Sequence, residues 1–367
     1  MRVSPSQLVP GCVLLRDVKG KTNKPIIPQK TVLTEKHIMI LSKFLIEEVD
    51  VSERLAEGTV FKPKGKKEEI TKTDHKIEDS NQPITNRSFE EHYLYVVENF
   101  KKLFKGWQNT VPIDNLAVRN LILPLIDRMD DIGSAVYALH QYADKKDYFY
   151  HHCVSVSILS AYLGKKMGYQ KGEWYQIALA GLLSDAGMAR LEDFAFIKEG
   201  ILTKEEKLEI RNHPTYSYRM VENISSIPYT VKLAVLQHHE RIDGSGYPLG
   251  LSHEKIHGYA RIIAVSDIYH AMTSDRYYRK KQSPFQVIEE LQKEQFTKLD
   301  PRVVQVFVDS IAKFSIGTRV SLSNEQVGEI VFIEHKHPTR PIVRLDNGEI
   351  ITLSNNKNLF INEILST

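Results

Sequence analysis

Cysteine is scarce in this chain of 367 residues, which contains only Cys12 and Cys153. Two cysteines cannot form the disulfide framework of a small secreted domain, so their number favours a reducing compartment. The sequence also lacks any apolar run of about 18 residues, the length that a transmembrane helix needs. Its N-terminus lacks the short apolar core of a signal peptide. We therefore expect a cytoplasmic protein with no membrane partner.

An excess of charge of either sign is missing as well. The chain has 49 Lys and Arg residues against 46 Asp and Glu residues. Such a balance produces no strong electrostatic field, so a role that depends on a basic surface, such as general DNA binding, is not expected. The hydrophobic share of 42% and the charged share of 26% are typical of a soluble protein with room for two or three domains.

The pattern of apolar and charged residues divides the chain into four regions. Residues 1–61 contain short apolar stretches and an amphipathic segment, which predict a small N-terminal α/β accessory module. Residues 62–84 carry many charges and few large apolar groups, so we expect a linker. Helical periodicity dominates residues 85–314, and residues 315–367 change to a period of two. The predicted fold class is mainly α: a helical bundle followed by a small C-terminal β-barrel-like module.

Local signals mark several elements within these regions. An amphipathic helix is expected around residues 35–46. Capping boxes begin at Ser88 and at Thr203, and the second is expected to open the helix that carries His213. The tripeptide Asp346-Asn347-Gly348 between two apolar runs predicts a β-hairpin.

Histidine and aspartate recur at or beside the apolar helices of the bundle. Asp185 directly follows one of them, and a buried unpaired carboxylate requires a cation or strong hydrogen-bond donors. A single histidine on a helix is more often a satisfied or exposed side chain than a ligand. Two carboxylates and four imidazoles on the helices of one bundle, however, are typical of a metal site, and paired metals can promote phosphoryl transfer. The candidate ligands are His152, Asp185, His213, His238, His239 and Asp267.

These residues resemble the HD-GYP family, whose members hydrolyse the second messenger cyclic di-GMP. The resemblance covers roughly residues 145–312. It is carried by His152, Ser184-Asp185, His213-Pro214, His238-His239-Glu240-Arg241, the loop from Asp243 to Pro248, and the segment from Ser266-Asp267 to Arg279. The resemblance implies the helical bundle of the HD superfamily, a catalytic role for Asp185, and one or two divalent transition-metal ions, iron or manganese.

Two metal positions that share Asp185 are implied by the resemblance. The second position has all of its ligands: Asp185, His213, His238 and His239. The first would use His152, Asp267, the shared aspartate and a histidine, but this chain has Ser184 in place of that histidine. A serine hydroxyl is a poor ligand for a transition metal, so the first position should bind its ion weakly.

Three further departures from the family pattern stand near the site. Met188 replaces a lysine beside the phosphate and offers no charge. The losses at Ser184 and Met188 would each remove roughly 2–4 kcal/mol of transition-state stabilisation, together on the order of a thousandfold or more in rate. Tyr148 replaces a glutamate that holds a third metal in some members, so no third metal is expected. Ser217 replaces a glycine, a change of minor importance.

The nucleotide-binding residues implied by the family are retained. They are Gly246, Tyr247 and Pro248 of the loop, together with Arg276 and Arg279. An aromatic ring can stack on guanine, and an arginine can bind phosphate or the guanine edge. The alternative is a tight turn with solvated arginines, in which Arg241 and Asp243 brace the loop through a salt bridge.

Three functions remain open at this point. The first is a degenerate HD-GYP protein that binds cyclic di-GMP or a related nucleotide and at least one metal, with weak or no hydrolysis. The second is an active but weakened metal-dependent cyclic di-GMP phosphodiesterase. The third is an adaptor for other signalling proteins. A homodimer through the helical segment at 88–140 is a further option.

Overall fold

A computed structural model describes the chain outside residues 4, 6–7, 20–24, 35–36, 39–40, 42–45, 47, 53, 57–58, 60, 62–86, 192–199, 201, 277–279, 312–315, 335–336, 357 and 366–367. The chain separates into two compact units, Met1–Asn81 and Gln82–Thr367. The predicted linker lies within the residues that are not described, as does the boundary at 314. The division into four regions therefore stays a proposal.

The N-terminal unit is built from short antiparallel strand pairs. Strand β1 (Arg2–Val3) pairs with β4 (Val49–Asp50), and β2 (Val18–Lys19) pairs with β3 (Pro25–Ile27). Their apolar side chains form a separate core, which includes Leu8, Cys12, Leu14, Leu33, Leu41, Val51 and Phe61. Most of the helix that we predicted around residues 35–46 falls outside the described residues.

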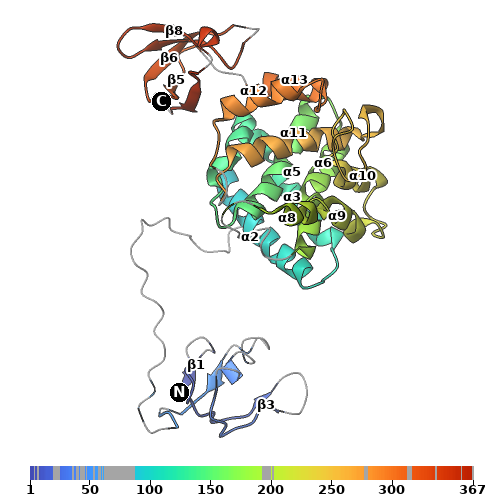
Figure 1. The fold of residues 1–367 in the computed structure, drawn as a ribbon. Helices are drawn as coiled ribbons and strands as arrows, with labels where there is room; N and C mark the ends of the chain where they lie inside the picture. Colours follow the sequence, from blue (N-terminus) through green and yellow to red (C-terminus); the bar gives the residue numbers. More distant parts are fainter. Residues whose placement is uncertain are drawn as a thin grey trace. The chain divides into compact units, whose positions relative to one another are not determined.

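Helices form the bulk of the second unit, as predicted (Figure 1). The first helices are α2 (Phe89–Gln108), α3 (Asn115–Ile126), α4 (Met129–Ile132), the 3-10 segment η3 (Gly133–Tyr142), α5 (Tyr148–Lys166), α6 (Lys171–Leu183) and η4 (Ala186–Arg190). They are followed by α8 (Lys204–Ile210), α9 (His213–Val221), α10 (Tyr229–Gln237), η5 (His253–Lys255), α11 (Gly258–Thr273), α12 (Pro284–Glu294) and α13 (Pro301–Ile311). Among the described helices, none is long and apolar enough to cross a membrane.

The capping signals are observed, with one correction. Ser88 and Glu91 form the predicted capping box at the start of α2, and Thr203 caps α8. The helix that Thr203 opens ends at Ile210, however, and His213 begins a new helix rather than continuing the first. The physical reason is Pro214, which has no N–H to continue the earlier helix and is well placed in the first turn of a new one.

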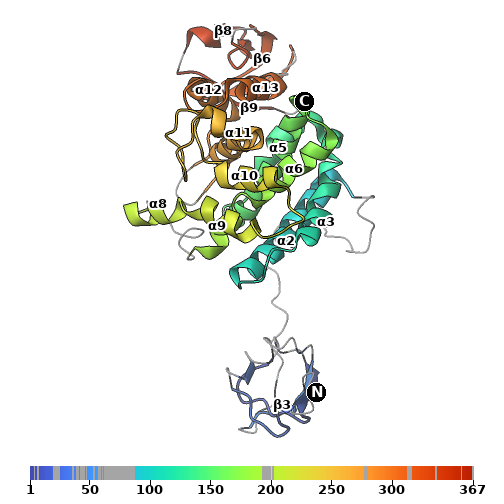
Figure 2. The same ribbon diagram turned by 90° about the vertical axis from the view of Figure 1, so that its right-hand side faces the viewer.

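Close packing of α5 against α6 positions the site. The two helices lie side by side in Figures 1 and 2. Gly181 of α6 approaches α5 so closely that a Cβ there would lie 3.2 Å from Cα of Ser157. Ser157 Oγ also donates a hydrogen bond to the carbonyl oxygen of Ala178 at 2.7 Å. Because a short connection makes the helices antiparallel, the start of α5 with His152 lies near the end of α6, where Asp185 follows.

The C-terminal segment forms the predicted small β module. Five antiparallel strands lie in the order β8-β7-β6-β5-β9. They are β5 (Arg319–Leu322), β6 (Val327–Phe332), β7 (Ile342–Leu345), β8 (Ile350–Thr352) and β9 (Ile361–Ile364). The expected hairpin joins β7 to β8, and Gly348 has the positive φ of +87° that this turn requires.

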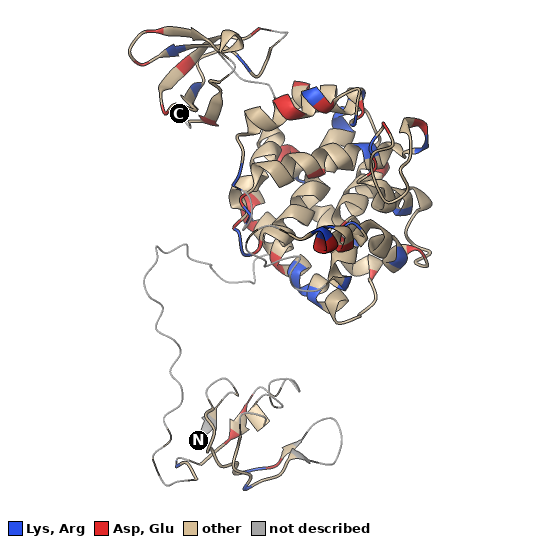
Figure 3. Cartoon of the chain, viewed as in Figure 1, with Lys and Arg blue, Asp and Glu red and all other residues tan. Residues whose placement is uncertain are grey.

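Helix α12 carries the contacts between this sheet and the helices. The ring of Phe285 is buried in the core of the β module. Ser283 Oγ donates to the carbonyl oxygen of Ile361 at 2.6 Å. Arg340 donates to both carboxylate oxygens of Glu289, from Nε at 2.6 Å and from Nη2 at 2.7 Å. Basic and acidic residues are otherwise interspersed over the helices, as the charge balance predicts (Figure 3).

We predict that Arg340→Ala lowers the free energy of unfolding by about 2–3 kcal/mol, because a half-buried carboxylate loses a bidentate partner. Arg344→Ala is the matched control. Arg344 pairs with Glu329 on the surface, where both side chains are at least one-third exposed, and its loss should change stability by less than about 1 kcal/mol. Urea denaturation measures both variants, and equal midpoints would contradict this account of the attachment.

Candidate metal centre

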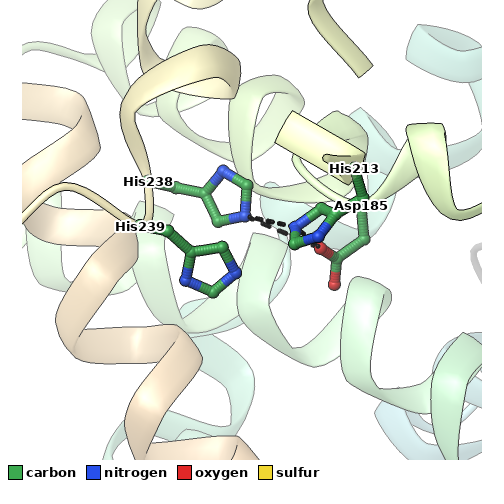
Figure 4. Close-up of side chains that lie close together, drawn as sticks. All are labelled: Asp185, His213, His238 and His239. Atoms are coloured by element: carbon green, nitrogen blue, oxygen red, sulfur yellow. Dashed lines mark hydrogen bonds and ion pairs between the residues drawn. The ribbon is translucent and has the colours of Figure 1, made fainter. Parts of the chain in front are cut away.

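Four of the predicted ligands converge from separate elements. Asp185 lies between α6 and η4, two residues after α6 ends, His213 begins α9, and His238 and His239 follow α10. One ligand atom from each lies within 4.8 Å of every other (Figure 4). These are the four residues that the resemblance assigns to the second metal position.

His213 and His238 present the same nitrogen to Asp185. Nδ1 of His213 lies 2.7 Å from the carbonyl oxygen of Ile210, and Nδ1 of His238 lies 2.8 Å from that of Val235. A carbonyl oxygen can only accept, so each Nδ1 carries a hydrogen and Nε2 of each neutral ring carries a lone pair. Metal-ligating histidines take this tautomer when their other nitrogen donates to a carbonyl.

The lone-pair atoms of these side chains meet at one point. Nε2 of His213 lies 3.0 Å from Oδ1 of Asp185, and Nε2 of His238 lies 3.6 Å from the same oxygen. The two Nε2 atoms are 3.1 Å apart. Lone pairs at such distances repel one another unless a cation lies among them, either a metal ion or added protons. Imidazole and carboxylate ligands suit a divalent transition metal, so the residues present fit such an ion.

The ionisation of Asp185 suits metal binding. Burial raises the pKa of this carboxyl, but a proton on Nε2 of His213 and of His238 would provide hydrogen bonds and positive charge that more than offset that effect. The pKa of Asp185 is therefore held well below its ordinary value. A carboxylate that stays ionised in a buried position is available to bind a cation.

Asp267 and His239 show the corresponding pattern on the other side of the site. Burial raises the pKa of Asp267, yet the pKa lies below its ordinary value, and the hydrogen bond from His152 is the largest cause that lowers it. Burial is the largest cause that lowers the pKa of His239 well below its ordinary value, with the charge of His238 next. At neutral pH the carboxyl is ionised and the His239 ring is neutral, as ligands of a metal must be.

His152 contacts both carboxylates. Its Nε2 lies 3.0 Å from Oδ1 of Asp267 and 3.6 Å from Oδ2 of Asp185. Asp185 thus turns one oxygen to His152 and the other to the histidines of α9 and α10, the arrangement that a bridging carboxylate would have. His152 lies in the second turn of α5, four residues after the helix begins. The structure therefore connects all six predicted ligands, although their role as ligands stays a proposal.

Ser184 does not face this centre with a free hydroxyl. Its Oγ donates a hydrogen bond to the carbonyl oxygen of Ala180 at 2.7 Å, one turn earlier in α6, and the side chain is buried. Such a bond back to the preceding turn is common for serine in helices. The serine is thus held by its own helix.

Ser217 has more structural importance than we expected. Its hydroxyl donates to the carbonyl oxygen of Ser184 at 2.6 Å and accepts from the N–H of Gly187 at 2.7 Å. These bonds tie α9 to the turn that carries Asp185. Met188 of the same turn is nearly buried and packs in the helical core. No periodicity in the sequence singles out Ser217, since the hydroxyl acts across two separate elements.

His270 is a residue of this region that sequence reasoning missed. Nδ1 of His152 lies 3.1 Å from Nδ1 of the buried His270 ring and 3.2 Å from the hydroxyl of Tyr148. These contacts orient the ring of His152 so that Nε2 faces Asp267. A signal was available, because His270 is three residues after Asp267 in one helix, and such residues share a face.

The Gly-Tyr-Pro loop is held by Glu240. Its buried carboxylate accepts hydrogen bonds from the N–H groups of Leu249 at 2.7 Å and Leu251 at 2.8 Å. Gly246 lies against the chain so closely that a Cβ there would be 2.3 Å from the backbone nitrogen of Arg241. The glycine is therefore required for packing, and the Tyr247–Pro248 peptide is cis.

The alternative salt bridge between Arg241 and Asp243 is not observed. Arg241 donates instead to the carbonyl oxygen of Glu240 at 2.9 Å. Asp243 accepts from the backbone N–H of Ser245 at 2.9 Å and from its hydroxyl at 2.7 Å. A carboxylate two residues before a serine can form these local bonds without any long side chain crossing the loop.

Tyr247 already has stacking partners within the protein. Its ring stacks on that of His239, with centroids 4.7 Å apart and planes inclined by 25°. The guanidinium of Arg211 lies over the same ring, 4.4 Å from its centroid. Burial raises the pKa of the Tyr247 hydroxyl, which stays neutral. A guanine that stacks on Tyr247, as the resemblance implies, would therefore compete with one of these groups.

Of the two arginines predicted to bind the nucleotide, the structure describes only Arg276. Arg276 lies over the ring of Tyr148, 4.6 Å from its centroid, and Nη2 donates to the carbonyl oxygen of Ala271 at 2.7 Å. Arg279 lies outside the described residues.

Comparison with known proteins finds relatives of the helical region. Residues 140–303 match the family model described as HD domain. Residues 140–303 are thus similar to HD domains, which agrees with the resemblance to the HD-GYP family, and the helices of the second unit confirm the predicted mainly α fold.

The relatives include proteins named as phosphodiesterases of cyclic dinucleotides. The chain is 34% identical over 212 residues to cyclic di-GMP phosphodiesterase PA4108 of Pseudomonas aeruginosa, an alignment that covers 56% of this chain and 51% of the relative. It is 30% identical over 202 residues to cyclic di-GMP phosphodiesterase PdeB of Borreliella burgdorferi, covering 54% and 53%. A third relative is 3'3'-cGAMP-specific phosphodiesterase 1 of Vibrio cholerae. It is 31% identical over 182 residues, an alignment that covers 49% of this chain and 42% of the relative.

The chain spans about half the length of these curated relatives. Among solved structures it is similar to Bd1817, a HDG"Y"P protein from Bdellovibrio bacteriovorus, with a TM-score of 0.47 and 16% identity. That likeness covers 84% of this chain and 98% of the other.

We predict that Asp185→Asn weakens metal binding at least about tenfold, because it removes the charge shared by the converging ligands. Metal analysis after dialysis against a limiting Mn²⁺ concentration measures this change. Asp243→Asn is the control, since that exposed carboxylate bonds only within its loop, and it should retain the wild-type metal content. Equal metal content in both variants would contradict the assignment of Asp185.

Removal of the metal should also lower stability. An ion that binds only the folded chain adds about 2.7 kcal/mol when its free concentration is one hundred times Kd. We therefore expect a lower melting temperature in the presence of a chelator, and a smaller effect of the chelator on Asp185→Asn. A wild-type melting temperature that does not respond to chelator or added Mn²⁺ would count against a metal at this centre.

Proposed function

We propose that this chain is a degenerate HD-GYP protein of cyclic di-GMP signalling. In this proposal it binds cyclic di-GMP, or a related cyclic dinucleotide, and at least one divalent metal ion, with weak or no hydrolysis. Iron or manganese is the proposed metal, by resemblance to the family. The names of the relatives support the class of ligand, because they include phosphodiesterases of cyclic di-GMP and of 3'3'-cGAMP.

The observation that carries the proposal is the contrast between the two halves of the centre. One half brings together a carboxylate and three imidazoles within 4.8 Å. The other half has His152 and Asp267 in contact at 3.0 Å, but the hydroxyl of Ser184 is bonded to Ala180. Binding of one metal is therefore supported, whereas the ligand set for a second is incomplete.

The difference between the two halves of the centre also affects the expected rate of phosphodiester hydrolysis. A divalent metal ion supplies Lewis acidity toward a phosphoryl oxygen and lowers the pKa of water. Among this chain's own residues, Asp185 would help to hold an ion at either position, while Met188 adds no positive charge beside the phosphate. Loss of one preorganised charge or ligand removes about 2–4 kcal/mol of transition-state stabilisation, so the two losses together support slow turnover or none.

An active but weakened phosphodiesterase is the second candidate. The observation that favours it is the retained contact of His152 with both carboxylates. Water in place of the missing imidazole would allow an ion to bind there with reduced affinity. In that case hydrolysis would be slow but measurable. Its rate would still rise with metal concentration after the position at Asp185, His213, His238 and His239 is saturated.

An adaptor role is the third candidate. Leu94 and Tyr95 of α2 are exposed apolar side chains on the helical segment proposed to pair with another copy. This function would require neither nucleotide nor turnover, and a signalling protein or a second copy would be the partner.

The deciding experiment measures binding and turnover on one metal-loaded sample of the full chain. The proposal predicts saturable binding of cyclic di-GMP by calorimetry, with a rate of hydrolysis at least about a thousandfold below that of an intact family member. Hydrolysis at a rate typical of enzymes would overturn it. Absence of binding under every metal condition would leave the adaptor as the remaining candidate.

A gain of function is predicted for the double variant Ser184→His with Met188→Lys. It restores one ligand and one charge, so metal content should rise toward two ions per chain and hydrolysis should increase by about a hundredfold or more. Adding Asp185→Asn to the same double variant is the control, because it removes the shared carboxylate and should abolish the gain. No gain in metal content would show that Ser184 is not the cause of the weak half.

A further inference from the structure

Arg211 lies beside the metal centre without a carboxylate partner in the described part of the chain. It directly follows α8, two residues before His213, and its side chain is exposed. The guanidinium lies 4.4 Å from the centroid of the Tyr247 ring. That ring in turn stacks on His239, so a positive charge stands one ring away from a proposed metal ligand. Neither the motifs of the sequence nor the family resemblance singled out this residue.

A second set of side chains repeats this arrangement at the other half of the centre. There the ring of Tyr148 stacks on His152, with centroids 5.4 Å apart, and the guanidinium of Arg276 lies 4.6 Å from the centroid of Tyr148. Each half therefore has an arginine, a tyrosine and a histidine in contact. Arg276 is the residue already expected to contact the nucleotide, so the equivalent environment suggests the same task for Arg211.

The chemistry of a guanidinium fits a phosphodiester in this position. Arginine presents a fixed fork of N–H donors that can bind two oxygens of one phosphate, and the face of a tyrosine ring stabilises its charge. A cyclic dinucleotide carries two phosphodiester groups, and its binding requires positive charge around the metal. Met188, which lies in η4, provides no positive charge there.

We propose that Arg211 contacts a phosphate of the bound cyclic dinucleotide and supplies positive charge that position 188 lacks. This inference rests on the proposed function, because it assumes that the nucleotide binds at the metal centre. In this arrangement the ring of Tyr247 holds the guanidinium of Arg211 in place.

The test uses the full chain loaded with Mn²⁺ and calorimetric titration with cyclic di-GMP at low and high salt. Arg211→Ala should weaken binding about ten- to a hundredfold at low salt, the range expected for a hydrogen bond to a charged group. The loss should shrink as salt rises, because salt screens the interaction of an exposed charge. Arg211→Lys keeps the charge without the fork and should bind with intermediate affinity.

Arg219→Ala is the matched control. Arg219 is an exposed arginine on the next helix that pairs with Glu222 at 3.0 Å, and its loss should leave binding unchanged. Metal content and melting temperature should be equal in all of these variants. If Arg211→Ala binds like wild type, or weakens binding only together with a loss of metal, the proposal for Arg211 is wrong. If wild type itself fails to bind cyclic di-GMP, the proposed function fails and this inference falls with it.

Discussion

The repulsion among three converging lone pairs is the constraint on which the centre depends. Because Nδ1 of His213 and of His238 each face a carbonyl oxygen, both Nε2 atoms must turn their lone pairs toward Oδ1 of Asp185. Only a cation makes this arrangement favourable, and protons or a metal ion can supply it. The packing of α5 on α6 and the break before α9 both place side chains around this point. The fold therefore brings together a set of side chains that fits a cation.

Much of the fold could be predicted from local patterns. The capping box at Ser88, the hairpin at Gly348 and the change from helical to alternating periodicity depend on neighbouring residues alone, and each is observed. The boundary before His213 was missed, because the capping box at Thr203 and the apolar spacing beyond it read as one continuous helix. Pro214 is where the two helices separate.

The proposed ligands of the centre could be predicted from the sequence. The residues that hold these ligands in position could not. The six proposed ligands could be recognised from residue type and from the family motif. The contacts of Ser217, Glu240, His270 and Arg211 join elements far apart in the sequence or run through backbone atoms. The spacing of residues along the sequence does not predict such contacts. Ser184 shows the difference well: the sequence identifies a missing imidazole, and only the structure shows its hydroxyl bonded to Ala180.

The claim that one half of the centre is complete and the other is not can be tested most directly by crystallography with anomalous scattering from Mn²⁺-loaded protein. The account predicts a strong anomalous peak within bonding distance of Asp185, His213, His238 and His239. Between His152 and Asp267 it predicts a much weaker peak or none. Two peaks of equal height would contradict the account, because Ser184 would then not have weakened the first metal position.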